Sequence, residues 1–192
     1  LKVQLNKATS PDLMYSKLHE EKLTIYLSEE LLGFVDSDRE DSGEELIAET
    51  VKSRLKLTEE KGYIIPKVVF KDDENLNPCE FSIRIRGMEV FRAGVCPNHL
   101  MFYADELKTK IKNSVKSIDA ITDRDVVWVE KDLAKDFWQQ GLTPSEYISK
   151  ALEYVAVKYV EDLLDYDDID KYLEVVEKEN EFFKCKIMLK IS

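Results

Sequence analysis

Catalysis by a histidine would require His19 or His99, the chain's two histidines, to lie beside a serine or cysteine nucleophile. The run Cys96-Pro97-Asn98-His99 places a thiol close in sequence to an imidazole, which is the composition of a thiol-dependent hydrolase. No G-x-S-x-G nucleophile elbow or comparable signature supports such a site. We therefore predict that the histidines are surface or supporting residues, that no residue is catalytic and that the protein is not an enzyme.

Cofactor and metal motifs are absent from the sequence. The three cysteines, Cys79, Cys96 and Cys185, are too widely spaced for a zinc knuckle. Their odd number argues against a disulfide framework and favours a reducing compartment, so we expect a cytoplasmic location. No G-x-G-x-x-G or Walker A loop is present to hold a nucleotide. We therefore predict no cofactor and no metal site.

An acidic run between Asp162 and Asp170 invites a calcium interpretation. An EF-hand loop that began at Asp165 would need glycine at its sixth position and glutamate at its twelfth. The chain has Asp170 and Val176 at these positions. We interpret the run as a solvated acidic turn between two helices.

The charge of the chain limits its partners. A formal net charge of −11 repels phosphate backbones, so nucleic acid is not an expected partner. The basic cluster at residues 108–116 is spaced like a solvated helix face.

No apolar run approaches the roughly 20 residues of a membrane helix, so we expect a soluble chain without a membrane segment. The chain begins with Leu1, which is compatible with a piece of a longer protein.

The first half of the sequence predicts a strand, a helix and a hairpin after a linker or arm. The strand covers residues 23–27 because Leu23, Ile25 and Leu27 alternate with polar residues. A capping box of Ser42 and Glu45 begins a helix that ends at glycine 62. We expect its buried face to consist of apolar residues at helical spacing, namely Leu46, Ile47, Val51 and Leu55. Short strands follow at residues 68–70, 81–86 and 88–91, the last two joined at Arg86-Gly87.

The second half predicts mostly helices. We predict two short helices, at residues 105–116 and 131–139, on either side of a buried strand at 126–129. Trp128 in that strand is assigned to the core, whereas Trp138 could pack between subdomains or contact a partner. Thr143-Pro144-Ser145-Glu146 forms a second capping box at the start of a long helix. A polar helix after residue 165 and a strand in the tail at 182–192 complete an α+β chain.

Several of these segments, in this order, resemble the cytoplasmic domain of FlhA-type export gates, the FHIPEP family of flagellar and type III secretion systems. The resemblance is carried by an apolar segment that ends in aspartate, a glycine-aromatic-x-aliphatic-proline element, a polar turn that leads into a hairpin, a tryptophan strand and a long final helix. In this chain these are residues 31–36, 62–68, 71–90, 126–130 and 147–173.

The resemblance implies a division into subdomains. Residues 1–22 would be a linker or arm, and residues 23–100 with 144–163 a first subdomain of ferredoxin- or thioredoxin-like type. Residues 101–143 would form a small inserted second subdomain, and residues 164–192 the start of a partly helical third. In the family, a cleft near the second subdomain receives export chaperones with their substrates, and the third subdomain builds a ring. The cleft residues implied here are Asp119 and Thr122, where Thr122 replaces a family aromatic.

We therefore expect a non-enzymatic docking module on the cytoplasmic side of an export gate. Its expected partners are export chaperones, their substrates and other subunits of the export apparatus, with a ring-shaped homo-oligomer possible for the full-length protein. A stand-alone adaptor or regulatory domain that kept the fold without the secretion role is the alternative, because of the threonine at 122.

Overall fold

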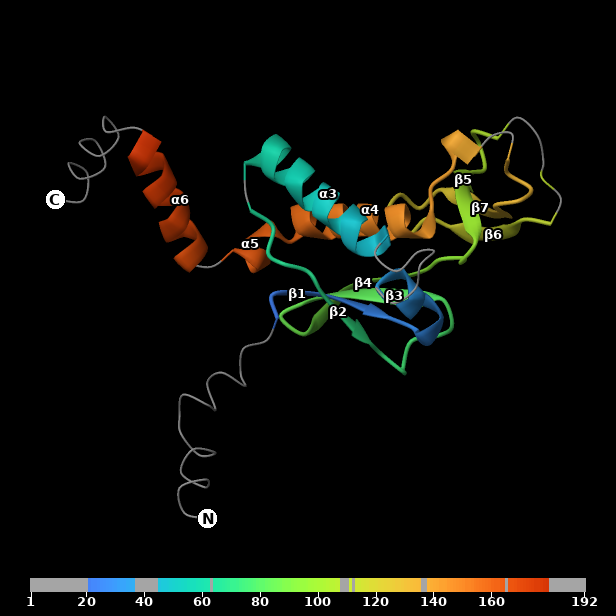
Figure 1. Cartoon of the computed structure of the whole chain (residues 1–192), viewed down its shortest axis with the longest axis horizontal. Helices are drawn as coiled ribbons and strands as arrows, with labels where there is room; N and C mark the ends of the chain where they lie inside the picture. Colours follow the sequence, from blue (N-terminus) through green and yellow to red (C-terminus); the bar gives the residue numbers. More distant parts are fainter. Residues whose placement is uncertain are drawn as a thin grey trace, which may run out of the picture.

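The computed structural model describes residues 21–36, 45–62, 64–107, 111, 113–135, 138–164 and 166–179. Two β-sheets are joined by helices, and Figure 1 shows the helices α3 and α4 lying over the larger sheet. This confirms the predicted α+β class. The arm at residues 1–20, the Ser42 cap and the tail at 182–192 lie outside the described residues. No helix in the described part of the chain is long and apolar enough to cross a membrane.

The larger sheet has the strand order β2-β1-β3-β4. Strand β1 (Leu23–Leu27) pairs in parallel with β2 (Val69–Asp72) and antiparallel with β3 (Glu80–Ile85). The parallel pair requires a crossover, which is supplied by the 3-10 helix η1 (Glu29–Phe34) and α3 (Glu45–Lys61). The predicted strand at 23–27 is confirmed, and it lies in the interior of the sheet.

A tight turn joins β3 to β4 (Met88–Gly94) where the sequence predicted it. Arg86 has φ 48° and Gly87 has φ 79°, so both central residues of the turn have positive φ. Positive φ at both positions gives a two-residue turn whose twist matches that of the two strands it joins. Gly62 has φ 76° and ends α3, as the helix-stop signal indicated.

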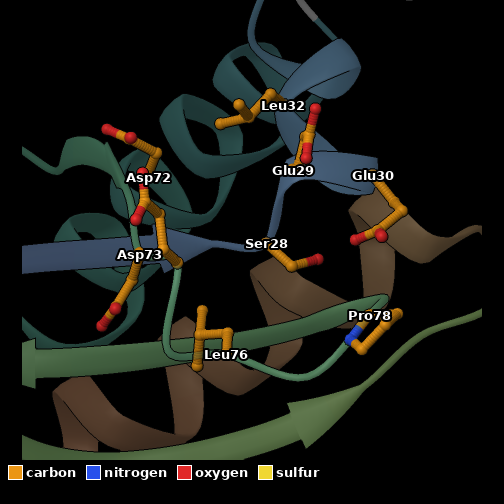
Figure 2. Close-up of a pocket in the computed structure, with 9 residues that line it drawn as sticks. Ser28, Glu29, Glu30, Leu32, Asp72, Asp73, Leu76 and Pro78 are labelled. Carbon is orange, nitrogen blue, oxygen red and sulfur yellow. The ribbon is translucent and has the colours of Figure 1, made fainter.

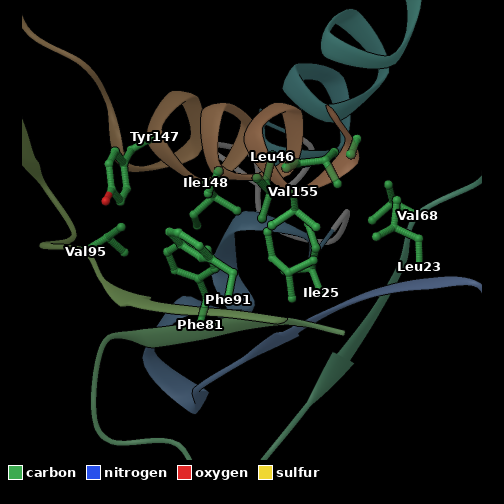
Figure 3. Close-up of a cluster of buried hydrophobic side chains, with 14 of the residues drawn as sticks. Leu23, Ile25, Leu46, Val68, Phe81, Phe91, Val95, Tyr147, Ile148 and Val155 are labelled. Atoms are coloured by element: carbon green, nitrogen blue, oxygen red, sulfur yellow. The ribbon is translucent and has the colours of Figure 1, made fainter. Parts of the chain in front are cut away.

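The main core lies between this sheet and the helix α4 (Pro144–Lys158). Figure 3 shows Ile148 and Val155 of α4 facing Ile25, Phe81 and Phe91 of the sheet. The predicted Thr143–Glu146 capping box is present: Thr143 Oγ1 accepts from the amide of residue 146 at 3.2 Å, and the Glu146 carboxylate accepts from the amide of residue 143 at 2.7 Å. The predicted long helix is interrupted after Lys158 and resumes as the short α5 (Val160–Leu163).

The predicted buried face of α3 is wrong in all but Leu46. Ile47, Val51 and Leu55 are 37%, 44% and 60% exposed. The face turned inward instead carries Leu46, Thr50, Ser53 and Leu57. The cause is a polar contact between α3 and α4, in which the Ser53 and Ser149 hydroxyls lie 2.8 Å apart and Ser149 Oγ donates to the Glu49 carbonyl at 2.9 Å. Because the small polar side chains of α3 face α4, the predicted apolar face of α3, which carries Ile47, Val51 and Leu55, is turned toward solvent.

The second sheet has the order β5-β7-β6, with both pairs antiparallel. Its strands are β5 (His99–Tyr103), β6 (Val115–Ile118) and β7 (Asp125–Glu130). Trp128 on β7 is 2% exposed, which confirms its assignment to the core. An isolated bridge between Met101 and Leu142 connects β5 to the start of α4.

Both short helices predicted for this region are wrong. Among the described residues of 105–116, positions 105–106 form a turn and 115–116 begin β6, whose residues are all exposed. Strand β6 lies at the edge of its sheet and is exposed at every position, so no alternation of buried and exposed residues marks it in the sequence. Residues 131–135 form turns, and among the described residues of this segment only the 3-10 helix η2 (Trp138–Gln140) is helical.

The last helix, α6 (Tyr166–Glu179), extends from the end of the molecule opposite to the second sheet (Figure 1). Among the described residues, α6 contacts Lys22, which precedes β1, and Ile64, which lies between α3 and β2. Lys22 Nζ forms an ion pair with Asp168 at 2.7 Å, and the amide of Ile64 donates to the Tyr172 hydroxyl. The polar helix predicted after residue 165 is confirmed.

Candidate functional site

Asp119 lies in the turn between β6 and β7 and is 1% exposed. Its Oδ1 accepts hydrogen bonds from Tyr147 Oη and the amide of Ile121, both at 2.9 Å. Its Oδ2 accepts from Thr122 Oγ1 at 2.6 Å and Tyr103 Oη at 3.0 Å. A buried carboxylate is tolerated when donors surround it in this way. The network therefore connects β5, the turn and α4 through a single side chain.

The four donors also set the ionisation of the group. Burial would raise the pKa of Asp119, but the hydrogen bonds from Thr122, the amide of Ile121, Tyr147 and Tyr103 outweigh it and hold the pKa below its usual value. Burial and the bond to Asp119 raise the pKa of both tyrosines. At neutral pH the network therefore consists of an ionised carboxylate and neutral hydroxyls.

Thr122 and Asp119 have different exposures. The Thr122 side chain is exposed, whereas the carboxylate that it donates to is not. The structure brings the two residues implied by the resemblance into direct contact, but only one of them presents a surface to a partner. Their role in partner binding stays a prediction.

A groove of about 510 Å³ begins at Thr122 and runs between α3 and α4. We call it the Thr122 groove. Its lining residues come from α3, β5, the turn and α4: Leu57, Glu60, Lys61, Tyr103, Ile121, Thr122, Lys150, Glu153, Tyr154, Val157 and Lys158. Leu57, Ile121, Tyr154 and Val157 supply apolar surface, and charges of both signs stand around it.

Several of the groove's side chains are held in place by neighbours outside it. Glu153 accepts from Ser53 Oγ at 2.6 Å and from Lys56 Nζ at 2.9 Å. The ring of Tyr154 packs edge-on against Phe91, with centroids 6.1 Å apart. Pre-positioned apolar and aromatic side chains with a charged rim are the composition of a protein-binding surface. The groove residues carry no histidine or cysteine that could act as a nucleophile or a neutral-pH base.

The Cys96–His99 run shows no sign of an activated thiol. His99 Nδ1 lies 2.7 Å from the Pro97 carbonyl oxygen. Burial raises the pKa of the Cys96 thiol, which keeps the sulfur protonated and weakly nucleophilic at neutral pH. The described residues contain no group of three His, Cys, Asp or Glu side chains placed to hold a metal ion.

The sequence alone does not reveal which residues surround Asp119. Tyr103 and Tyr147 stand far from Asp119 in the chain, and no local pattern links them. Among the groove residues on α4, Lys150 also went unpredicted: it lines the groove, whereas its neighbours Ala151 and Leu152 are buried in the core. A tyrosine near the start of a capped helix was the one available signal, since a buried tyrosine hydroxyl needs a hydrogen-bond partner.

Comparison with known proteins places the chain in a family. The profile of the FHIPEP family matches residues 2–189. The flagellar biosynthesis protein FlhA of Helicobacter pylori is 21% identical over 162 residues, which cover 83% of this chain and 22% of that relative. The chain thus spans less than a quarter of that relative's length.

Solved structures of similar fold agree with this assignment. Chlamydia pneumoniae CdsV superposes with a TM-score of 0.70 at 17% identity, over 85% of this chain and 48% of that one. CdsV has also been solved in complex with CdsO. The nonameric EscV cytosolic domain from the type III secretion system gives a TM-score of 0.54 at 12% identity, over 85% of this chain and 46% of that one. At these identities the likeness is one of fold.

Proposed function

Since the chain belongs to the FHIPEP family, we propose that it forms part of the cytoplasmic domain of a flagellar or type III export gate. Its work there is non-enzymatic docking of protein partners on the cytoplasmic side of the membrane. The observation that carries the proposal is the Thr122 groove, in which apolar side chains lie beside charged ones and the exposed threonine is held by the buried Asp119 carboxylate.

We propose export chaperones with their substrates as the occupants of the groove. An apolar strip bordered by charges suits an amphipathic segment, which buries its apolar face and leaves its charges at the rim. The groove is lined by cations and anions together, so a partner of mixed charge fits better than one of a single sign: Lys61, Lys150, Lys158, Glu60 and Glu153.

Assembly with further subunits belongs to the same proposal. CdsV has been solved in complex with CdsO, and the EscV cytosolic domain has been solved as a nonamer. We propose that the full-length protein containing this chain also binds export-apparatus subunits and assembles with copies of itself. We further propose that its subdomains are formed by residues 23–100 with 144–163, by residues 101–143 and by residues 164–192.

Titration calorimetry of the 192-residue chain against purified export chaperones from the same genome tests the docking role. We expect saturable binding of at least one chaperone. A well-folded chain that binds none of them would refute docking, while the family assignment would stand.

A stand-alone adaptor is the second candidate, favoured by one observation. The Thr122 side chain is small and polar, and its hydroxyl donates to the buried Asp119 carboxylate. The aromatic residue of the family would present a large apolar surface at this position. The full reading frame distinguishes the two candidates. Several membrane helices encoded upstream in the same frame support the export gate, and a frame without them supports the adaptor.

A further inference from the structure

The Thr122 groove differs in charge from the rest of the chain, whose formal net charge is −11. A second pocket, of about 450 Å³, lies at the end of β1 and β2 and follows the overall balance, since five of its nine lining residues are acidic and none is basic. Figure 2 shows the carboxylates of η1 and β2 around that pocket. The Thr122 groove is instead lined by three lysines and two glutamates. This local reversal of sign favours a partner that brings negative charge.

The glutamates of the groove are largely compensated by lysines of α3. Lys56 Nζ donates to one carboxylate oxygen of Glu153 at 2.9 Å, and a serine hydroxyl of α3 donates to the other at 2.6 Å. Glu60 is followed directly by Lys61 at the end of α3, so their opposite charges offset each other there. The lysines of α4 are therefore the charges that remain for a partner.

Lys150, Tyr154 and Lys158 form one stripe of α4, because residues four apart lie on the same face of a helix. Lys158 Nζ donates to Tyr154 Oη at 3.1 Å and lies 5.3 Å from the centre of that ring. Lys150 is exposed, and its ammonium makes no ion pair or hydrogen bond with a residue that the structure describes. Over about 12 Å of the helix, one aromatic ring thus lies between a cation that is already engaged and a cation that is available.

We propose that Lys150 selects the occupant of the Thr122 groove by pairing with a carboxylate beside the occupant's apolar anchor. The inference rests on the docking role proposed above and names the chemistry of the partner, an amphipathic segment in which glutamate or aspartate borders the apolar face. The apolar anchor would contact Tyr154 and Val157, and the carboxylate would lie within reach of the Lys150 ammonium. A basic residue at that border would place like charges together, which disfavours binding.

Nuclear magnetic resonance titration of the full 192-residue chain tests the proposal. The probe is an acetylated, amidated, alanine-based helical peptide with leucines on one face, glutamates beside the leucines and lysines on the opposite face. Its matched control has glutamine in place of each glutamate. We expect saturable shifts of the amide signals of Thr122, Lys150 and Tyr154, and an affinity about fivefold higher for the glutamate peptide. Equal affinities, or no saturable shift at these amides, would overturn the proposal.

Two lysine variants decide whether Lys150 causes the preference. Lys150→Gln should weaken the glutamate peptide about fivefold and change the glutamine peptide by less than about twofold, since only the first peptide carries the carboxylates. Lys131→Gln removes an exposed lysine after β7, outside the groove, and should change neither affinity. Equal effects of the two variants on the glutamate peptide would refute the role of Lys150.

The peptides also separate this proposal from the docking role itself. A chaperone that binds the chain while the two peptides bind equally would overturn the Lys150 proposal alone. A clear preference for the glutamate peptide in a chain that binds no chaperone would support the Lys150 proposal and refute chaperone docking.

Discussion

The Tyr147 hydroxyl on α4 donates to the Asp119 carboxylate at 2.9 Å, which joins the helix over the larger sheet to the turn between β6 and β7. The Tyr147 ring also packs edge-on against Phe81 of the larger sheet and Trp128 of the second one, with centroids 6.4 Å and 6.1 Å away. One buried side chain therefore contacts both sheets and the turn that carries Thr122. The position of the Thr122 groove depends on this contact.

Asp119→Asn should lower the free energy of unfolding by about 2–3 kcal/mol. The amide has one acceptor oxygen in place of two, so part of the ring of donors from Tyr103, Tyr147 and Thr122 is left without its charged acceptor. Urea denaturation followed by circular dichroism measures the loss. The control is Asp125→Asn, an exposed position on β7, which should stay within about 0.5 kcal/mol of the unsubstituted chain. Equal stability of the two variants would contradict the network's structural role.

The same carboxylate should contribute to stability in a pH-dependent way. Its pKa in the folded chain lies below the unfolded value of about 3.9, so the folded form binds the proton less readily. The contribution is complete above that unfolded value and is lost as the pH falls through the lower folded value. Urea midpoints measured from neutral pH into this acidic window should fall more steeply for the unsubstituted chain than for Asp119→Asn. Parallel curves would show that Asp119 does not titrate as described.

The glycines offer a test of packing between β5 and the start of α4. A Cβ at Gly141 would lie 2.6 Å from the Phe102 ring, closer than carbon atoms approach in practice, and 3.0 Å from Leu100 Cβ, which is a tight contact. Gly141→Ala should therefore cost about 1–3 kcal/mol through displacement of these side chains. Gly94→Ala is the control, because its Cβ would meet only the Cys79 carbonyl oxygen at 3.8 Å. Thermal denaturation should separate the two variants clearly, and a neutral Gly141→Ala would show that Phe102 moves freely.

The sequence predicted those elements whose signals are local. Alternation identified β1 and β3, the Arg86-Gly87 pair located the hairpin, and the Thr143 box located the start of α4. The second sheet was only partly recognised, because β6 is exposed throughout and β5 was not identified. The face of α3 was misassigned because the Ser53–Ser149 contact is a property of two helices together, visible in neither alone.

The residues of the candidate site were likewise predictable only in part. The resemblance identified Asp119 and Thr122, and the structure shows them in direct contact. It could not show that Asp119 is buried, since the tyrosines that enclose it come from other elements.

Binding of an export chaperone to two matched valine variants tests the docking account most directly. Val157 on α4 lines the Thr122 groove and is 45% exposed, while Val51 on α3 lies outside it and is 44% exposed. Val157→Asp should weaken calorimetric binding at least about tenfold, because a charge would enter the apolar strip, and Val51→Asp should leave it unchanged. Equal affinities for both variants, with both chains folded, would contradict docking in the Thr122 groove.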